Sequence, residues 1–133
     1  MAANFNAYVW WAIRRAYGLI TEDGVVSKRG YTMAQYSKFI RPGAVRVAAT
    51  RPSVANVSVT AYRSGEQLVV VALNQNDQAQ TINLDVYNGC ATSLSRYTTS
   101  ASKNVADDGS VALMQGRAAV TLEAQSITTF VSR

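Results

Sequence analysis

The sequence has 133 residues, 48% of them apolar and 16% charged, so it is long enough for one domain with its own core and lacks the composition of a disordered chain. It contains no histidine, which excludes Ser-His-Asp triads, Cys-His dyads and histidine-ligated zinc. Its one cysteine, Cys90, excludes an intrachain disulfide and a CxxC metal pair, and we predict no metal site and no cofactor.

The formal net charge of +5 comes entirely from the first part of the chain. Residues 1–50 carry seven basic and two acidic residues, whereas residues 51–133 carry six of each. The basic residues fall in a predicted helix and its loops, which favours a solvated face over a nucleic-acid surface. No segment approaches the roughly twenty apolar residues of a membrane span, and no signal-peptide pattern opens the chain. We expect neither nucleic acid nor membrane as a partner.

The first 43 residues predict a strand, a loop and a helix. Residues 7–13 (AYVWWAI) are an apolar run typical of a strand buried on both faces of a parallel sheet. After a polar turn at residues 21–24, a helical pattern covers residues 28–40, where Met33, Tyr36 and Ile40 share one face and Pro42 ends the helix. Such a unit leaves both strand edges unpaired, so its neighbours should come from outside this chain or from another copy.

From residue 44 onward apolar residues recur at every second position, which predicts short strands. Turn signals separate these strands, among them Asn88-Gly89 and Asp107-Asp108-Gly109. We therefore predict a mainly β protein, with an antiparallel β-sandwich over residues 44–133 preceded by the strand–loop–helix unit over residues 1–43. The expected strands cover residues 45–49, 57–62, 67–73, 81–86, 93–98, 110–114, 118–122 and 126–131.

The acidic residues predict no catalytic centre. Hydrolysis of a glycosidic bond uses two carboxyl groups roughly 5 to 9.5 Å apart. Glu22 and Asp23 share a polar turn, Asp107 and Asp108 precede a glycine, and Glu123 has nothing reactive near it in sequence. We interpret all of these as solvated turn or strand-end residues, and we name no catalytic residue.

A cluster of aromatic and basic residues lies within ten positions, at the end of the first predicted strand. Indole and phenol faces can stack on sugar rings, and a guanidinium can hold a carboxylate through two hydrogen bonds. Buried tryptophans with arginines in solvent would explain the cluster almost as well. The tyrosines of the sandwich (Tyr62, Tyr87 and Tyr97) also have two readings, as a sugar-binding surface or as cross-strand pairs. The cluster comprises Tyr8, Trp10, Trp11, Arg14, Arg15 and Tyr17.

The run WWxIRRxYG…EDGxxSKRGYxMxxxSKFIRPG resembles the C-terminal part of bacterial glycoside hydrolase family 30 xylanases, in the glucuronoxylanase subfamily, and the likeness continues through LVVVALN, RYTTSASKN and AQSITTFVSR. The resemblance implies a side β-sandwich fused to the last βα unit of a (β/α)8 barrel. It also implies a secreted, retaining endo-β-1,4-xylanase whose two catalytic glutamates lie on barrel strands outside this sequence. By motif position, Trp11, Arg15 and Tyr17 correspond to the loop that recognises the glucuronate branch of the substrate.

Three hypotheses follow from the resemblance. The chain is the C-terminal piece of a glucuronoxylanase, inactive alone, that keeps part of the branch-sugar subsite. Alternatively, it is a separate xylan-binding module, or a purely structural side domain. The partners implied are glucuronoxylan, the catalytic barrel of the parent enzyme and a second copy of the chain, paired through residues 7–13 or through an open edge of the sandwich.

Overall fold

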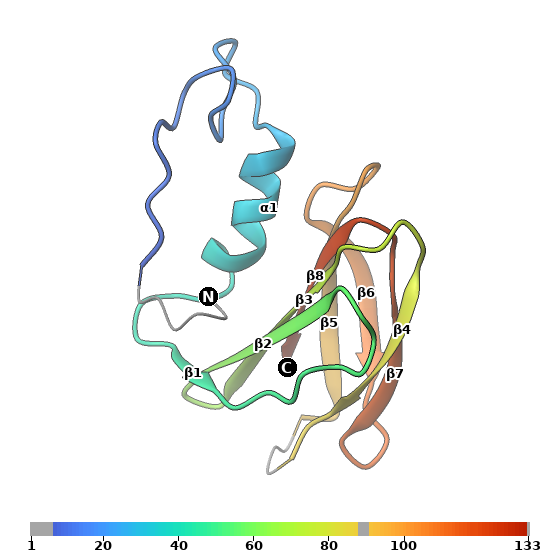
Figure 1. Ribbon diagram of the computed structural model, residues 1–133. Helices are drawn as coiled ribbons and strands as arrows, with labels where there is room; N and C mark the ends of the chain where they lie inside the picture. The colour runs from blue at the N-terminus through green and yellow to red at the C-terminus, as the bar shows by residue number, and fades with distance from the viewer. Residues whose placement is uncertain (1–6, 88–90, 133) are drawn as a thin grey trace.

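The computed structural model describes residues 7–87 and 91–132, and in them one helix precedes eight strands (Figure 1). Cys90 and the Asn88-Gly89 turn signal lie outside the described residues. The prediction of a mainly β protein with antiparallel sheets is confirmed. The elements are α1 (Lys28–Ser37), β1 (Val45–Val47), β2 (Val57–Ser64), β3 (Gln67–Asn74), β4 (Gln80–Asp85), β5 (Ser93–Thr99), β6 (Ala106–Ala112), β7 (Arg117–Leu122) and β8 (Ser126–Ser132).

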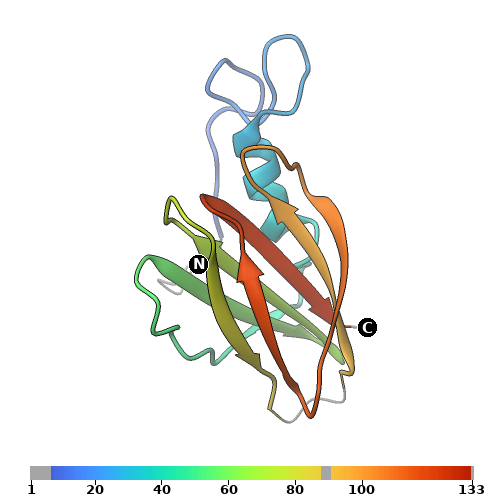
Figure 2. The ribbon, with the colours of Figure 1, turned by 90° about the vertical axis from the view of Figure 1, so that its right-hand side faces the viewer.

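The strands form two sheets of unequal width. The larger has the order β1-β2-β3-β8-β5-β6, and the smaller pairs β4 with β7 (Figure 2). All strand pairs are antiparallel; the β3–β8 pair, for example, places Ala72 opposite Thr128. Because two strands cannot cover six, the small sheet leaves hollows along both of its edges, beside β4 and beside β7.

The main core lies between the two sheets. Its most enclosed side chains are Phe130, Leu94 and Leu122, each fully buried, and β3 contributes Val70 and Ala72 from one of its faces. The other face of β3 presents Val69 and Val71, which are buried in a second cluster. Strand β3 is apolar without alternation because both faces of the large sheet are covered there.

Helix α1 covers the outer face of the large sheet and contacts β5 and β8 (Figure 1). Tyr36, Phe39 and Ile40, from the helix and the turn after it, pack on the second cluster. The Gln35 side chain is fully buried; its Nε2 donates to Thr99 Oγ1 over 2.8 Å, and Thr129 Oγ1 donates to the Gln35 carbonyl oxygen over 2.8 Å. The sequence predicted the apolar helix face, but nothing in it signalled the buried glutamine.

Two predictions differ from the structure. Residues 7–13 form no strand: an isolated bridge joins Arg14 to Ile20, and the described chain places no partner strand beside the run. Asp107-Asp108-Gly109 is not a turn between strands but a β-bulge inside β6, where the register shifts by one residue against β5 and Gly109 adopts φ +82°. The assignment of residues 1–43 to a barrel stays a prediction.

Candidate functional site

The segment between residue 14 and the helix is a loop closed by its own hydrogen bonds. The Arg14 side chain donates from Nε and Nη2 to the Glu22 carbonyl oxygen over 3.0 and 2.6 Å. The Thr21 amide donates to the Val25 carbonyl oxygen over 2.8 Å, and the Val25 amide donates back to Thr21 Oγ1 over 3.1 Å. Arg14 is therefore a loop anchor, since its guanidinium is used within the chain.

Ser27 joins this loop to α1. Its hydroxyl donates to the Gly18 and Leu19 carbonyl oxygens over 2.8 and 3.0 Å and accepts the Gly30 amide over 3.2 Å as the helix N-cap. The loop lies so close to the helix that a Cβ atom on Gly30 would collide with the Leu19 carbonyl oxygen. A glycine in the first turn of α1 thus permits the close approach of the two segments.

The three predicted site residues lie on the outside of this region. Trp11 is 81% exposed, Tyr17 is 51% exposed and Arg15 is exposed. Within the described chain, the Arg15 side chain forms no hydrogen bond or ion pair, and the three side chains make no stacking or cation–π contact with one another. Arg29 instead donates to the Tyr17 carbonyl oxygen and lies 5.0 Å from the ring centre of Trp10. The structure thus leaves one guanidinium and two aromatic rings exposed near one loop; their role in binding stays a prediction.

The prediction of a solvated turn is wrong for Asp108, whereas Glu123 follows a strand as expected and joins Asp108 in an ion network. Lys103, in the loop between β5 and β6, places its Nζ atom 2.8 Å from Asp108 Oδ1 and 2.5 Å from Glu123 Oε1. Arg96 Nε lies 3.9 Å from Asp108 Oδ2, and the Asp108 side chain is only 17% exposed. Arg96, Lys103 and Asp108 belong to the β5–β6 hairpin, and the loop after β7 adds Glu123.

The pKa values of this acidic pair are unsuited to glycoside hydrolysis. Burial opposes ionisation of Asp108, but the Lys103 hydrogen bond and the nearby Arg96 charge outweigh it and lower the pKa of its carboxyl. Hydrogen bonds from Lys103 and Ser100 lower the pKa of Glu123. A general acid of a glycosidase needs a raised pKa, whereas both of these groups remain ionised.

Of the three sandwich tyrosines, the structure leaves only Tyr87 well exposed. Tyr62 is buried beneath α1 at 5% exposure. Tyr97 lies against Phe39 with ring centres 4.7 Å apart. Tyr87 follows β4, is 74% exposed, and its hydroxyl lies 3.5 Å from Asp85 Oδ2. The alternation of β2 gave no sign that Tyr62 is buried, because Tyr62 shares its phase with the polar Ser58 and Thr60; the helix buries it.

In residues 7–87 and 91–132, no three acidic, cysteine or histidine side chains gather where they could hold an ion. Nor does the described part of the chain contain a helix with the length and apolarity to span a bilayer.

Comparison with known proteins finds a matching domain family and similar sequences. The sequence profile of the glycosyl hydrolase family 30 beta sandwich domain matches residues 43–130. The glucuronoxylanase XynC of Bacillus subtilis is 46% identical over 128 residues, which are 96% of this chain and 30% of the relative.

Solved structures of GH30 xylanases also match the chain. A GH30 endoxylanase from Clostridium papyrosolvens superposes with a TM-score of 0.93 and 42% identity, over 98% of this chain and 34% of that one. The GH30 subfamily 8 xylanase Xyn30A from Clostridium acetobutylicum gives a TM-score of 0.83 and 35% identity, over 89% of this chain and 31% of that one. The chain therefore spans about a third of the length of the proteins that it matches.

Proposed function

The chain belongs to glycoside hydrolase family 30 through its β-sandwich domain, and we propose that it is the side domain of a glucuronoxylan-degrading endo-β-1,4-xylanase, together with part of the loop that recognises the glucuronate branch. One observation carries the proposal: 46% identity to a glucuronoxylanase extends over 96% of the chain and so includes the loop before α1 as well as the sandwich.

The loop has the chemistry for an acidic sugar. Arg15 is exposed and free of ion pairs among the described residues, so its planar guanidinium can give two parallel hydrogen bonds to a uronate carboxylate. Trp11 and Tyr17, 81% and 51% exposed, offer flat apolar faces to sugar rings. Neighbouring Arg14 cannot serve in the same way, because it is bound to the Glu22 carbonyl oxygen.

We propose that the 133-residue chain alone does not hydrolyse xylan. Among the described residues, Asp108 and Glu123 share one lysine and have lowered pKa values. Asp85 and Glu66 are each paired with an arginine. Release of reducing sugars from glucuronoxylan by the purified chain would contradict this.

Affinity electrophoresis tests the branch-sugar subsite. The chain should be retarded more strongly in gels containing glucuronoxylan than in gels containing unsubstituted xylan. Arg15→Ala should abolish that difference, with a loss of roughly 10- to 100-fold in affinity for the substituted polymer, because a charge-assisted hydrogen bond contributes about 1.5 to 3 kcal/mol. Arg63→Ala, which removes an equal charge from the β2–β3 hairpin, is the matched control. Equal retardation of the wild type by both polymers would refute the subsite.

A second candidate, a general xylan-binding module, is favoured by the exposure of Tyr87 on the far side of the sandwich. It predicts retardation that does not depend on the glucuronate branch. Absence of retardation in either gel would favour a purely structural side domain.

We further propose that the isolated chain self-associates and that the parent enzyme is secreted, since a polymer such as xylan is degraded outside the cell. Val9 and Ile13 are 88% and 65% exposed in the run that would pair with neighbouring strands. Beside the unpaired edge of β4, a hollow of about 490 Å³ is lined by Val59, Ile82 and Leu84. Light scattering at micromolar concentration should show a dimer or larger species; a monomer with residues 7–13 protected from hydrogen exchange would count against it.

A further inference from the structure

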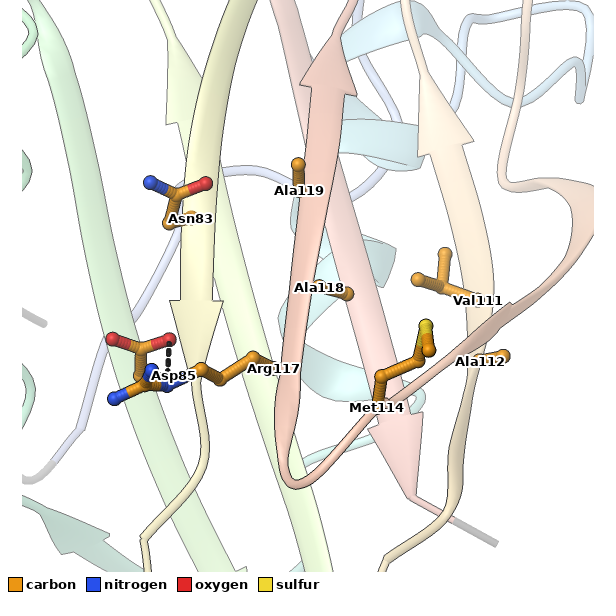
Figure 3. Close-up of a pocket in the computed structure, with 8 residues that line it drawn as sticks. All are labelled: Asn83, Asp85, Val111, Ala112, Met114, Arg117, Ala118 and Ala119. Carbon is orange, nitrogen blue, oxygen red and sulfur yellow. Dashed lines mark ion pairs between the residues drawn. The ribbon is translucent and has the colours of Figure 1, made fainter.

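A hollow runs along β7, from the outer face of the small sheet to strand β6 of the large sheet, and neither the loop nor the helix lines it. It crosses β7 from Asn83 and Asp85 on one side to Met114 on the other (Figure 3). The small side chain of Ala119 leaves room on the exposed face of β7, and the hollow's volume of about 630 Å³ falls within the range of roughly 300 to 1,000 Å³ that is usual for small-molecule sites. We call this hollow, whose polar side chains are Asn83, Asp85 and Arg117 and which Val111 and Ala112 of β6 also line, the β7 trough.

The polar groups of the trough are planar, and their net charge is zero. Arg117 Nε lies 3.4 Å from Asp85 Oδ1, as Figure 3 shows, and their side chains are 68% and 39% exposed. Asn83 is exposed and lies two residues before Asp85, on the same face of β4. A carboxylate, a guanidinium and an amide offer both donors and acceptors to hydroxyl groups. Because the ion pair cancels its own charge, the trough favours a neutral, hydroxyl-rich ligand over an anion.

Apolar surface lies beside these polar groups. Met114 lines the trough and is 80% exposed. Tyr87 is 74% exposed and lies outside the lining of the trough, next to its ion pair, with its hydroxyl 3.5 Å from Asp85 Oδ2. A flat ring and a thioether next to hydrogen-bonding groups match a pyranose, which has apolar C–H faces and a rim of hydroxyls.

The trough is separate from the predicted branch-sugar loop. Helix α1 and the loop before it lie on the outer face of the large sheet, whereas β4 and β7 cover the opposite face (Figure 1). A ligand in the trough therefore does not compete with one at Arg15.

We propose that the β7 trough is a second polysaccharide-binding site, which takes the neutral backbone of β-1,4-xylan without regard to its glucuronate branches. The choice of xylan rests on the proposed function, while the neutrality and the position of the site rest on the trough itself.

Affinity electrophoresis in unsubstituted xylan tests this with paired variants of the 133-residue chain. Ala119→Gln fills the trough floor with a neutral side chain and should remove the retardation; Ser58→Gln, at an exposed position of β2, should not. Tyr87→Ala should weaken binding about fivefold or more, the effect of losing one contact worth about 1 kcal/mol, whereas Val45→Ala, at an exposed apolar side chain of β1, should leave it unchanged.

The outcomes separate the two sites. Retardation by unsubstituted xylan that survives Arg15→Ala and is lost in Ala119→Gln supports the trough. A wild-type chain that migrates freely in unsubstituted xylan overturns the trough, even if an Arg15-dependent retardation in glucuronoxylan upholds the branch-sugar subsite. Ala119→Gln binding unsubstituted xylan as well as the wild type also overturns it. Thermal unfolding followed by circular dichroism confirms that each variant is folded.

Discussion

Replacement of Phe39 by alanine should release α1 and its loop from the sandwich while the sheets stay folded. Phe39 follows the helix, packs on the second apolar cluster and lies 4.7 Å from the Tyr97 ring between centres. The Lys38 ammonium lies 5.3 Å from both ring centres. These contacts hold the helix on the sheet from its C-terminal end, while Gln35 holds its middle.

The size of the effect follows from the burial and the stacking of this ring. Full burial of a phenylalanine contributes about 1.5 to 3 kcal/mol, so the half-buried Phe39 contributes about 1 to 1.5 kcal/mol. An aromatic pair adds about 0.5 to 1.5 kcal/mol. A total of about 1.5 to 3 kcal/mol should raise the population of undocked helix roughly 10- to 150-fold.

Hydrogen exchange, measured at the amides of residues 32–37 and of β3, tests whether the helix is released without unfolding of the sheets. In Phe39→Ala the helix amides should exchange roughly 10- to 150-fold faster, with the β3 amides unchanged, because local opening leaves the main core intact. In the control Phe130→Ala, a fully buried core residue is lost at a cost of about 3 to 5 kcal/mol, and both sets should accelerate. Equal acceleration of helix and β3 amides in Phe39→Ala would refute the view that the helix is a separately docked unit.

Three further changes have defined outcomes. Because folding lowers the pKa values of Asp108 and Glu123, the two carboxylates stabilise the fold above the ordinary carboxyl pKa, and this stabilisation is lost as the pH falls through the lowered pKa values. Lys103→Met should reduce the acid-dependent loss in the free energy of unfolding, measured by urea unfolding at a series of pH values. An unchanged pH dependence would contradict the ion network. Gly30→Ala should destabilise the loop and α1 by about 1 to 3 kcal/mol, although alanine is the better helix former, and a gain in melting temperature would show that the loop can move aside. Asn74→Ala should cost about 2 to 4 kcal/mol in thermal unfolding, because the buried amide joins the loops after β3 and β7 through four hydrogen bonds; a cost under about 1 kcal/mol would show that water replaces it.

The sequence by itself determined the family, the helix and most strands of the sandwich, although not the strand predicted over residues 7–13. Alternation of apolar and polar residues reflects one covered face per strand, and an unbroken apolar run such as that of β3 reflects two covered faces, so burial can be predicted from the local pattern. The sequence also brought Arg15 and its aromatic neighbours together, because they are close along the chain.

Only the tertiary structure decided what depends on distant residues meeting. Asp108 and Glu123 share Lys103 because of the β5–β6 pairing and the loop after β7. Gln35 is buried because α1 packs on the large sheet, where it is hydrogen-bonded to Thr99 and Thr129. Tyr87 is exposed beside Asp85 at the end of β4 in the narrow small sheet. The bulge at Gly109 shows the same limit: an Asp-Asp-Gly run suits a turn or a bulge equally well, and the hydrogen bonds of the neighbouring strand select between them. Residues 7–13 lack a strand for a related reason, since an apolar run becomes one only where another backbone lies alongside to satisfy its hydrogen bonds.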